Sequence, residues 1–388
     1  MNYDFNEVIN RRNTNSLKWN VGDNELPMWV ADMDFKTAPE IINALQKRVA
    51  HGVFGYSEVP DEWYKAYINW WKNRHGLEME REKLIFCTGV IPAISSLVRK
   101  LTTPAEKVLI QTPVYNIFYN SILNNGRQVL EAPLIYSDNH YTVDWDDLEK
   151  KLSDPQTTLM ILCNPHNPIG KIWDKDTLSR IGELCFNNHV TVISDEIHCD
   201  LTFPSKNYIP FASVNDVCRN VSITCIAPTK AFNIAGIQTA AVYAPNQMLC
   251  NKAFRSLNTD EVAEPNAFAV DAAVAAFSKS EDWLDSLRCY IYDNKLFVEK
   301  YIKEIIPQIS LISSEATYLL WIDCSNISDD TSELTDFIRK ETGLYISSGK
   351  QYGECSKKFV RVNIACPKSV LSEGLRKLAV GIRNYLER

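Results

Sequence analysis

Short runs of apolar residues, many of them β-branched, recur through the middle of the chain. They occupy residues 108–111, 158–163, 190–194, 221–226 and 239–244. Runs of this length in which nearly every position is apolar are typical of strands that are covered on both faces, as in a parallel sheet. The pattern therefore predicts a buried sheet in the middle of the chain.

Helical patterns lie between several of these runs. Residues 176–189 begin with Asp176, a plausible N-cap, and apolar residues then recur on one helical stripe. The stripe consists of Leu178, Ile181, Leu184 and Cys185. Strands that alternate with helices predict an α/β fold with a mostly parallel, doubly wound sheet flanked by helices.

The C-terminal third has a different pattern. Residues 280–305 form a long amphipathic helical pattern, and strand-like runs at 316–323 and 358–366 flank a predicted helix at 332–341. This order is typical of a smaller α+β unit. We therefore expect a large domain over residues 46–284, and a small domain made of residues 1–45 and 285–388.

Composition excludes several classes of protein. The 388 residues carry 41 Lys and Arg against 48 Asp and Glu, a formal net charge of −7, which argues against a general nucleic-acid binder. No apolar run approaches the roughly 20 residues needed to cross a bilayer. The first residues have no apolar stretch behind their charges, so no signal peptide is expected. These observations predict a cytoplasmic protein without a membrane partner.

The cysteines and histidines point away from disulfides and metals. The chain has 11 cysteines, an odd number, with no CxxC pair, and its 6 histidines show no metal-binding spacing. Most cysteines lie in apolar segments, where a thiol behaves as a small hydrophobe. We expect reduced core cysteines and no metal site.

Polar residues follow the predicted strands at their carboxyl ends. Tyr115, Asn167, Asp195 and Lys230 each come soon after a strand. Ligands of open α/β sheets bind at this edge. Each residue also has an ordinary interpretation: packing beneath a loop, a turn before proline, a helix cap, or a solvated amine. Their joint placement favours a binding site.

The sequence around these residues resembles the pyridoxal-phosphate enzymes of fold type I, the aspartate aminotransferase superfamily. The motifs, in order, are NPHNPIG at 164–170, SDEIH at 194–198, APTKAFNIAG at 227–236 and FVRVNIACP at 359–367. A closer resemblance, to the MalY/PatB branch of cystathionine β-lyases and related C–S lyases, rests on four further segments. These are LPMWVADMDF at 26–35, FGYSEVP at 54–60, TGVIPAI at 88–94 and SDEIHCDLTF at 194–203.

The resemblance implies roles for the residues at the strand ends. Lys230 would bind the aldehyde of pyridoxal 5′-phosphate and, once freed by substrate, act as the base for the Cα proton. Asp195 would pair with the pyridine nitrogen, and Asn167 would donate to the phenolate oxygen and contact the substrate carboxylate. Tyr115 would stack on the pyridine ring.

Further residues follow from the same resemblance. The phosphate would bind backbone amides of Val90 and Ile91, which open a predicted helix, and the hydroxyl of Thr229. Arg361 and Ala31 would hold the substrate α-carboxylate together with Asn167. Tyr56 would reach the neighbouring subunit's site, which implies a homodimer with sites at the interface.

Two positions depart from the aminotransferase pattern. His198 stands where many aminotransferases have a tyrosine that binds the phenolate oxygen, and the charge of its imidazole near neutral pH is open. Gln238 stands where many relatives have a phosphate-binding arginine. Both departures fit the C–S lyase branch better, and they leave the phosphate contacts open.

The resemblance implies β-elimination on cystathionine or an S-substituted cysteine, giving a thiol, pyruvate and ammonia, a reaction of methionine biosynthesis. The alternative is a class I/II aminotransferase that moves an amino group to a 2-oxo acid. A cofactor-sensing regulator would need a DNA-binding region before the enzyme-like pattern, which already begins within the first 30 residues. The side-chain pocket is expected near residues 29–35, Tyr115 and residues 258–266.

Overall fold

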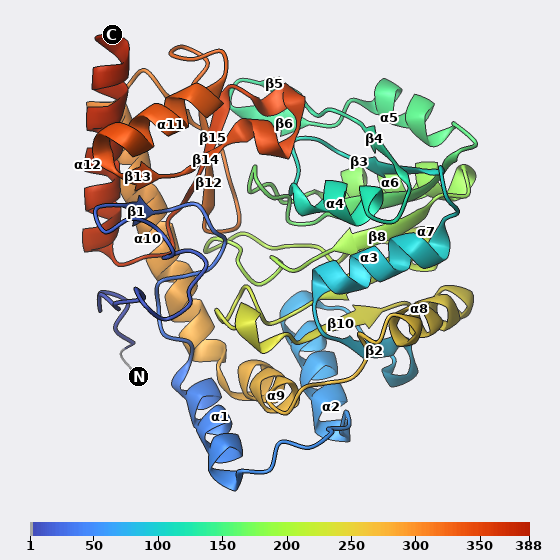
Figure 1. Ribbon diagram of the computed structural model, residues 1–388. Coiled ribbons are helices and arrows are strands. Elements are labelled where there is room, and N and C mark those ends of the chain that lie inside the picture. The colour runs from blue at the N-terminus through green and yellow to red at the C-terminus, as the bar shows by residue number, and fades with distance from the viewer. Residues whose placement is uncertain (1–2) are drawn as a thin grey trace.

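The computed structural model describes residues 3–388 (Figure 1). Its helices are α1 Pro39–His51, α2 Asp61–Trp70, α3 Val90–Leu101, α4 Ile117–Leu123, α5 Trp145–Leu152, α6 Lys175–Asn187, α7 Asp216–Val221, α8 Gln247–Thr259, α9 Ala269–Lys279, α10 Glu281–Ile305, α11 Thr331–Thr342 and α12 Lys368–Leu386. Its strands are β1 Leu26–Pro27, β2 Leu84–Cys87, β3 Lys107–Ile110, β4 Gln128–Glu131, β5 Ile135–Ser137, β6 His140–Thr142, β7 Thr157–Cys163, β8 Thr191–Asp195, β9 Ser222–Ile226, β10 Ala240–Tyr243, β11 Ser310–Leu311, β12 Leu319–Asp323, β13 Leu344–Tyr345, β14 Ser347–Ser348 and β15 Phe359–Asn363.

The central sheet has seven strands in the order β2-β10-β9-β8-β7-β3-β4. The pairs from β9 to β4 are parallel, while β10 pairs antiparallel with both β2 and β9. The expected mostly parallel α/β fold is therefore confirmed. The run at 239–244, expected as one of the parallel strands, is instead the reversed strand β10.

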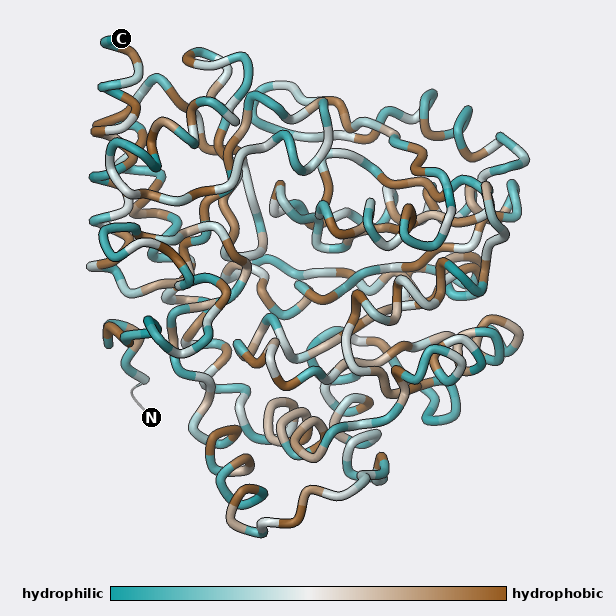
Figure 2. Tube along the Cα trace, in the orientation of Figure 1, coloured by the Kyte–Doolittle hydropathy of each residue, from teal (hydrophilic) through white to brown (hydrophobic). Residues whose placement is uncertain are grey.

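Helices cover both faces of this sheet because alternate strand residues point to opposite sides. In β3, Val108 and Ile110 pack with α3, α4 and α8, whereas Leu109 packs with α5, α6 and α7 on the other face. The strands at the centre of Figure 2 are accordingly hydrophobic along much of their length, and α5 at the outer edge is largely hydrophilic. Both faces of the sheet are buried, as the unbroken apolar runs predicted.

A second, smaller sheet lies in the C-terminal part. Strands β11, β12, β15 and β14 pair antiparallel in that order, and Trp321 of β12 lies opposite Arg361 of β15. Helix α10 links this part to the central sheet region, and α11 and α12 pack beside the small sheet (Figure 1).

The N-terminal arm joins this smaller part, since β1 pairs in parallel with β13. The expected boundaries at 45/46 and 284/285 fall inside α1 and α10, so neither lies in a loop. The division into two domains stays a prediction.

One detail of the helix prediction is wrong. Helix α6 begins at Lys175, and its N-cap is Asp174, whose carboxylate accepts a hydrogen bond from the Thr177 backbone N–H. Asp176, the expected cap, lies in the first turn instead. Two acidic residues stand two positions apart here, and the sequence does not say which one has extended backbone.

Nine of the 11 cysteines are buried as free thiols, and Cys289 and Cys355 are exposed. Within residues 3–388, no helix combines the length and the apolar character that crossing a bilayer requires.

Candidate active site

A cavity of about 240 Å³ lies at the carboxyl ends of β7 and β8 and beside the loop after β9. It is lined by Ala31, Thr88, Gly89, Val90, Ile91, Pro92, Tyr115, Cys163, Asn167, Asp195, Ile197, His198, Thr229, Lys230, Ala235 and Gln238. Nine of the residues predicted from sequence to form the site are among them. The strand-end rule therefore located the cavity, because carboxyl ends of parallel strands meet at one edge.

Lys230 is half-buried and lines this cavity, and its amine is poised between charged and neutral forms. Burial lowers the pKa to about 8, the carboxylates of Asp32 and Asp195 act in the opposite direction, and Arg361 lowers it further. Its Nζ donates a hydrogen bond to the carbonyl of Ala31 at 2.6 Å. About a tenth of such an amine is neutral at pH 7, far more than for an ordinary lysine, and the neutral form is the one that attacks an aldehyde.

Asp195, the last residue of β8, is a buried carboxyl group with few partners. Burial raises its pKa to about 7, while the Ile197 backbone N–H, which donates to Oδ1 at 3.1 Å, and Lys230 favour its charged form. The charged form of a carboxyl group in this setting is stabilised most by a cationic N–H donor that a ligand brings. A protonated pyridine ring fits that requirement.

His198 is neutral in this site. Burial, together with the positive charges of Lys230 and Arg361, lowers its pKa to about 3. The charge that was open from the sequence is thereby assigned. A neutral imidazole still donates one N–H, so His198 is suited to hold a phenolate oxygen without adding positive charge.

Arg361 and Asn167 face each other in the buried wall of the site. Arg361 donates to Asn167 Oδ1 at 3.3 Å and to the Trp29 carbonyl at 2.9 Å, and its guanidinium lies 4.8 Å from the centre of the Tyr352 ring. Its Nε–H is buried without a hydrogen-bond partner. A buried guanidinium with an unpaired donor favours a bound carboxylate.

The remaining walls suit a flat, phosphorylated ring. Tyr115 lines the cavity with its ring edge-on to Phe118, and Val90 and Ile91 open helix α3 directly after Gly89. The first-turn N–H groups of a helix form an anion site. Among the lining residues Lys230 is the sole cation, so a phosphate placed here would depend on backbone amides and on the side chains of Thr229 and Gln238.

Tyr56 is the predicted site residue that lies away from the cavity. Its side chain is fully exposed, on the segment between α1 and α2. Within one chain it is not among the residues that line the cavity, and its predicted role stays a prediction.

Sequence reasoning missed Tyr318 and Asn363, which approach the site from the small sheet. The Tyr318 hydroxyl donates to the Ala31 carbonyl at 3.0 Å, and Asn363 binds the carbonyls on either side of Ala31. Asn363 stands two residues after Arg361 on β15, and residues i and i+2 of a strand share a face, a signal that could have found it. Tyr318 carries no such signal.

Among the described residues, one group brings together ligand atoms of the kinds that metals use: His75, Cys199 and Asp200. Sequence spacing did not predict it. The Asp200 carboxylate already accepts hydrogen bonds from Trp70 and His75, and the Arg74 guanidinium lies 3.8 Å away. These hydrogen bonds and this ion pair are enough to explain why the three side chains lie together, with no bound metal ion required.

Comparisons with known proteins match this geometry. The family profile described as aminotransferase class I and II matches residues 18–378. Cystathionine β-lyase PatB of Bacillus subtilis (strain 168) is 40% identical, over 98% of this chain and 100% of that protein, and protein MalY of Escherichia coli (strain K12) is 33% identical, over 98% and 99%. The crystal structure of cystalysin from Treponema denticola, which contains pyridoxal 5′-phosphate, superposes with a TM-score of 0.96 at 32% identity, covering 99% of this chain and 100% of that one.

Proposed function

The chain belongs to the aminotransferase class I and II family, and on that premise we propose that it is a pyridoxal 5′-phosphate-dependent C–S β-lyase. The observation that carries the proposal is the convergence of an amine, a buried carboxyl group and an amide on one cavity, with a buried arginine bonded to the amide. Lys230, Asp195 and Asn167 line the cavity, and Arg361 donates to Asn167.

The residues of the cavity fit this cofactor. The buried Asp195 carboxyl group supplies the partner for a pyridine N–H, and Tyr115 supplies a ring face beside it. Asn167 and neutral His198 supply donors for the phenolic oxygen, while the start of α3 and Thr229 supply donors for the phosphate. When bound, this cofactor acts as an electron sink that stabilises negative charge at the substrate Cα.

The chain's own residues bind the substrate and move its proton. The Arg361 fork, with Asn167 and the Ala31 backbone, holds the α-carboxylate and so orients the Cα–H bond. The Lys230 amine, with a pKa of about 8, takes that proton. The C–S bond then breaks with its electron pair on sulfur, which leaves as a thiol once protonated. Water consumes the remaining three-carbon fragment, giving pyruvate and ammonia.

The test supplies cystathionine to the enzyme without any 2-oxo acid. We expect stoichiometric pyruvate, ammonia and thiol. An aminotransferase needs an amino acceptor for repeated turnover, so it would release no pyruvate here and would move amino groups once a 2-oxo acid is added. That second pattern would overturn the lyase proposal. A panel of S-substituted cysteines, scored by pyruvate release, then identifies the favoured side chain.

The Lys230→Ala variant tests the assignment of the lysine. Because the amine both binds the cofactor aldehyde and removes the Cα proton, we expect loss of the visible absorbance of lysine-bound cofactor and loss of turnover. Lys171→Ala, on the half-buried segment after the NPHNPIG motif, is the matched lysine control. A Lys230→Ala enzyme that kept both properties would remove Lys230 from the mechanism.

The quaternary and cellular assignments complete the proposal. We infer a homodimer in which Tyr56 enters the partner's site, supported by the full exposure of Tyr56 and by the partial exposure of its apolar neighbours Val53 and Phe54. The free cysteines support a cytoplasmic location, and the substrate class supports a place in methionine biosynthesis. A large cofactor domain and a small domain that includes the N-terminal arm are part of the same proposal.

A further inference from the structure

The segment of residues 29–34, here called the strap, contacts two functional side chains through its backbone. The carbonyl of Trp29 accepts a hydrogen bond from Arg361 at 2.9 Å. The carbonyl of Ala31 accepts one from the Lys230 amine at 2.6 Å and another from the Tyr318 hydroxyl at 3.0 Å. Because these contacts are made by backbone atoms, their geometry depends on what holds the strap in place.

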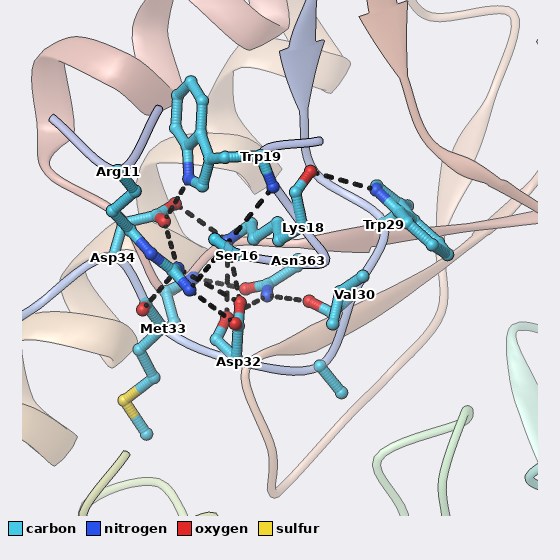
Figure 3. Close-up of polar contacts among 12 residues, drawn as sticks. Arg11, Ser16, Lys18, Trp19, Trp29, Val30, Asp32, Met33, Asp34 and Asn363 are labelled. Atoms are coloured by element: carbon cyan, nitrogen blue, oxygen red, sulfur yellow. Dashed lines mark hydrogen bonds and ion pairs between the residues drawn. The ribbon is translucent and has the colours of Figure 1, made fainter. Parts of the chain in front are cut away.

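Asn363 holds the strap from the small sheet (Figure 3). Its side-chain amide donates to the carbonyls of Val30 and Asp32, each at 2.6 Å, and its Oδ1 accepts from the Ala365 N–H at 2.8 Å. Both N–H groups and the oxygen are therefore engaged, and the side chain is buried. With the carbonyls on both sides of Ala31 fixed, the peptide group between them has little freedom to rotate.

The N-terminal arm holds the strap as well, through the side chains of Asp32 and Asp34 (Figure 3). Lys18, whose side chain is 1% exposed, pairs with Asp34 at 2.7 Å, and Arg11 pairs with Asp32 and Asp34, each at 2.7 Å. The Trp19 indole N–H donates to Asp34 at 2.8 Å. Buried ion pairs of this kind add little net stability over apolar packing, but they hold a fixed geometry.

From these contacts we propose that Asn363 is a positioning residue for Lys230. It clamps the strap so that the Ala31 carbonyl points at the lysine amine, and that carbonyl is the acceptor for the amine whenever Lys230 is not bound to the cofactor aldehyde. The proposal rests on the role of Lys230 given above, but not on which substrate the enzyme takes.

The clamp has a measurable consequence for the amine. A carbonyl oxygen binds a charged ammonium more strongly than a neutral amine, so an aimed carbonyl favours the protonated form of Lys230. The other groups that face the amine are the carboxyl groups of Asp32 and Asp195, the Arg361 guanidinium, the His198 imidazole and the Tyr318 hydroxyl. A neutral substitution of Asn363 changes the charge of none of them.

The chain offers a matched control in Asn294 on α10. It is equally buried, and its amide also donates to two backbone carbonyls, those of Ile364 and Cys366, each at 3.0 Å. These carbonyls belong to the same chain segment as Asn363, but they do not contact the strap or Lys230. Asn363→Leu and Asn294→Leu therefore each remove a two-carbonyl clamp of the same chemistry, with a side chain of similar shape.

The experiment measures the reactivity of Lys230 in the full-length, cofactor-free protein. Trace acetylation with acetic anhydride across a pH series, quantified by mass spectrometry of the Lys230 peptide, reports the free-amine fraction. We expect Asn363→Leu to raise the labelling rate at pH 7 about threefold to fivefold, equivalent to a pKa lowered from about 8 by about half a unit to one unit. Asn294→Leu should label like the wild type.

Identical labelling curves for Asn363→Leu and the wild type would overturn the proposal, as would an equal change in Asn294→Leu. Thermal unfolding of both variants checks that they are folded to the same degree, and Asn363→Ala replaces Asn363→Leu if the latter does not fold.

In the loaded enzyme we expect kcat to fall about tenfold in Asn363→Leu and less than twofold in Asn294→Leu. Because acetylation needs neither cofactor nor substrate, failure of the lyase assay and failure of this proposal are distinguishable.

Discussion

Burial shifts the pKa of three side chains in the cavity toward their neutral forms: Lys230, His198 and Asp195. It lowers the pKa of Lys230 to about 8 and that of His198 to about 3, and it raises the pKa of Asp195 to about 7. Each shift favours the neutral form, because a buried charge loses its hydration. In the protein without its cofactor, burial therefore favours the neutral forms of these groups. A ligand that brings a complementary charge would stabilise their charged forms.

The raised pKa of Asp195 predicts a pH-dependent stability. Its value is about 7 in the folded protein against 3.8 for an unperturbed carboxyl group, so the folded state binds more protons between these pH values. The free energy of unfolding therefore falls as pH rises from about 4 to about 7. In cofactor-free Asp195→Asn this contribution is absent.

Urea unfolding at pH 5 and pH 8 checks this expectation. The wild type should lose on the order of 2–4 kcal/mol more between the two pH values than Asp195→Asn does. Glu196, with a pKa also raised to about 7 mainly by burial, titrates in both proteins, and the Asp195 charge that adds to its shift is present only in the wild type. The same pH dependence in both proteins would show that Asp195 keeps an ordinary pKa.

At the scale of elements, helix α6 shows how a cap is chosen. Asp174 has extended backbone and its carboxylate accepts from both the N–H and the hydroxyl of Thr177, at 2.7 and 3.0 Å. Asp176, already helical, makes no such bond and contributes only its charge near the helix start. The two acids therefore differ in backbone geometry rather than in chemistry.

This difference predicts unequal effects of two similar substitutions. Asp174→Ala should lower the free energy of unfolding by about 1 kcal/mol, since it leaves first-turn N–H groups without the cap. Asp176→Ala should lower it by about 0.3 kcal/mol. Denaturant midpoints of the two variants give the comparison, and equal values would contradict the assignment of the cap.

At the scale of the whole molecule, the cavity and Tyr56 are separated within one chain. Tyr56 lies on an exposed segment with Val53 and Phe54, whereas Lys230 lines the cavity at the sheet edge. If Tyr56 serves the partner's site, inactivating substitutions in the two places complement each other across subunits. A closed two-fold dimer has two such composite sites.

Mixing subunits tests this arrangement. A hybrid of Lys230→Ala and Tyr56→Ala subunits has one site with both residues intact and one with neither. After unfolding and refolding an equal mixture, half of the dimers are hybrids, so we expect about a quarter of the wild-type activity. Activity no greater than the mean of the two parent variants would place Tyr56 in its own subunit's site or outside both.

Much of the fold and of the site followed from local patterns. Unbroken apolar runs indicated strands covered on both faces, and the polar residues after them marked the edge of the sheet. Both signals can be found in the sequence because they depend only on consecutive residues. Tyr115, Asn167, Asp195 and Lys230 were predicted in this way, and all four line the cavity.

Only the tertiary structure decided the rest, since it depends on residues far apart in the chain. The direction of β10 was hidden, because a strand buried on both faces has the same apolar pattern in either direction. The bonds from Asn363 to Val30 and Asp32, and from Lys230 to Ala31, join positions about 200 to 330 residues apart. Backbone carbonyls carry no sequence signature, so the strap that links Lys230 to Arg361 appears only once the chain is folded.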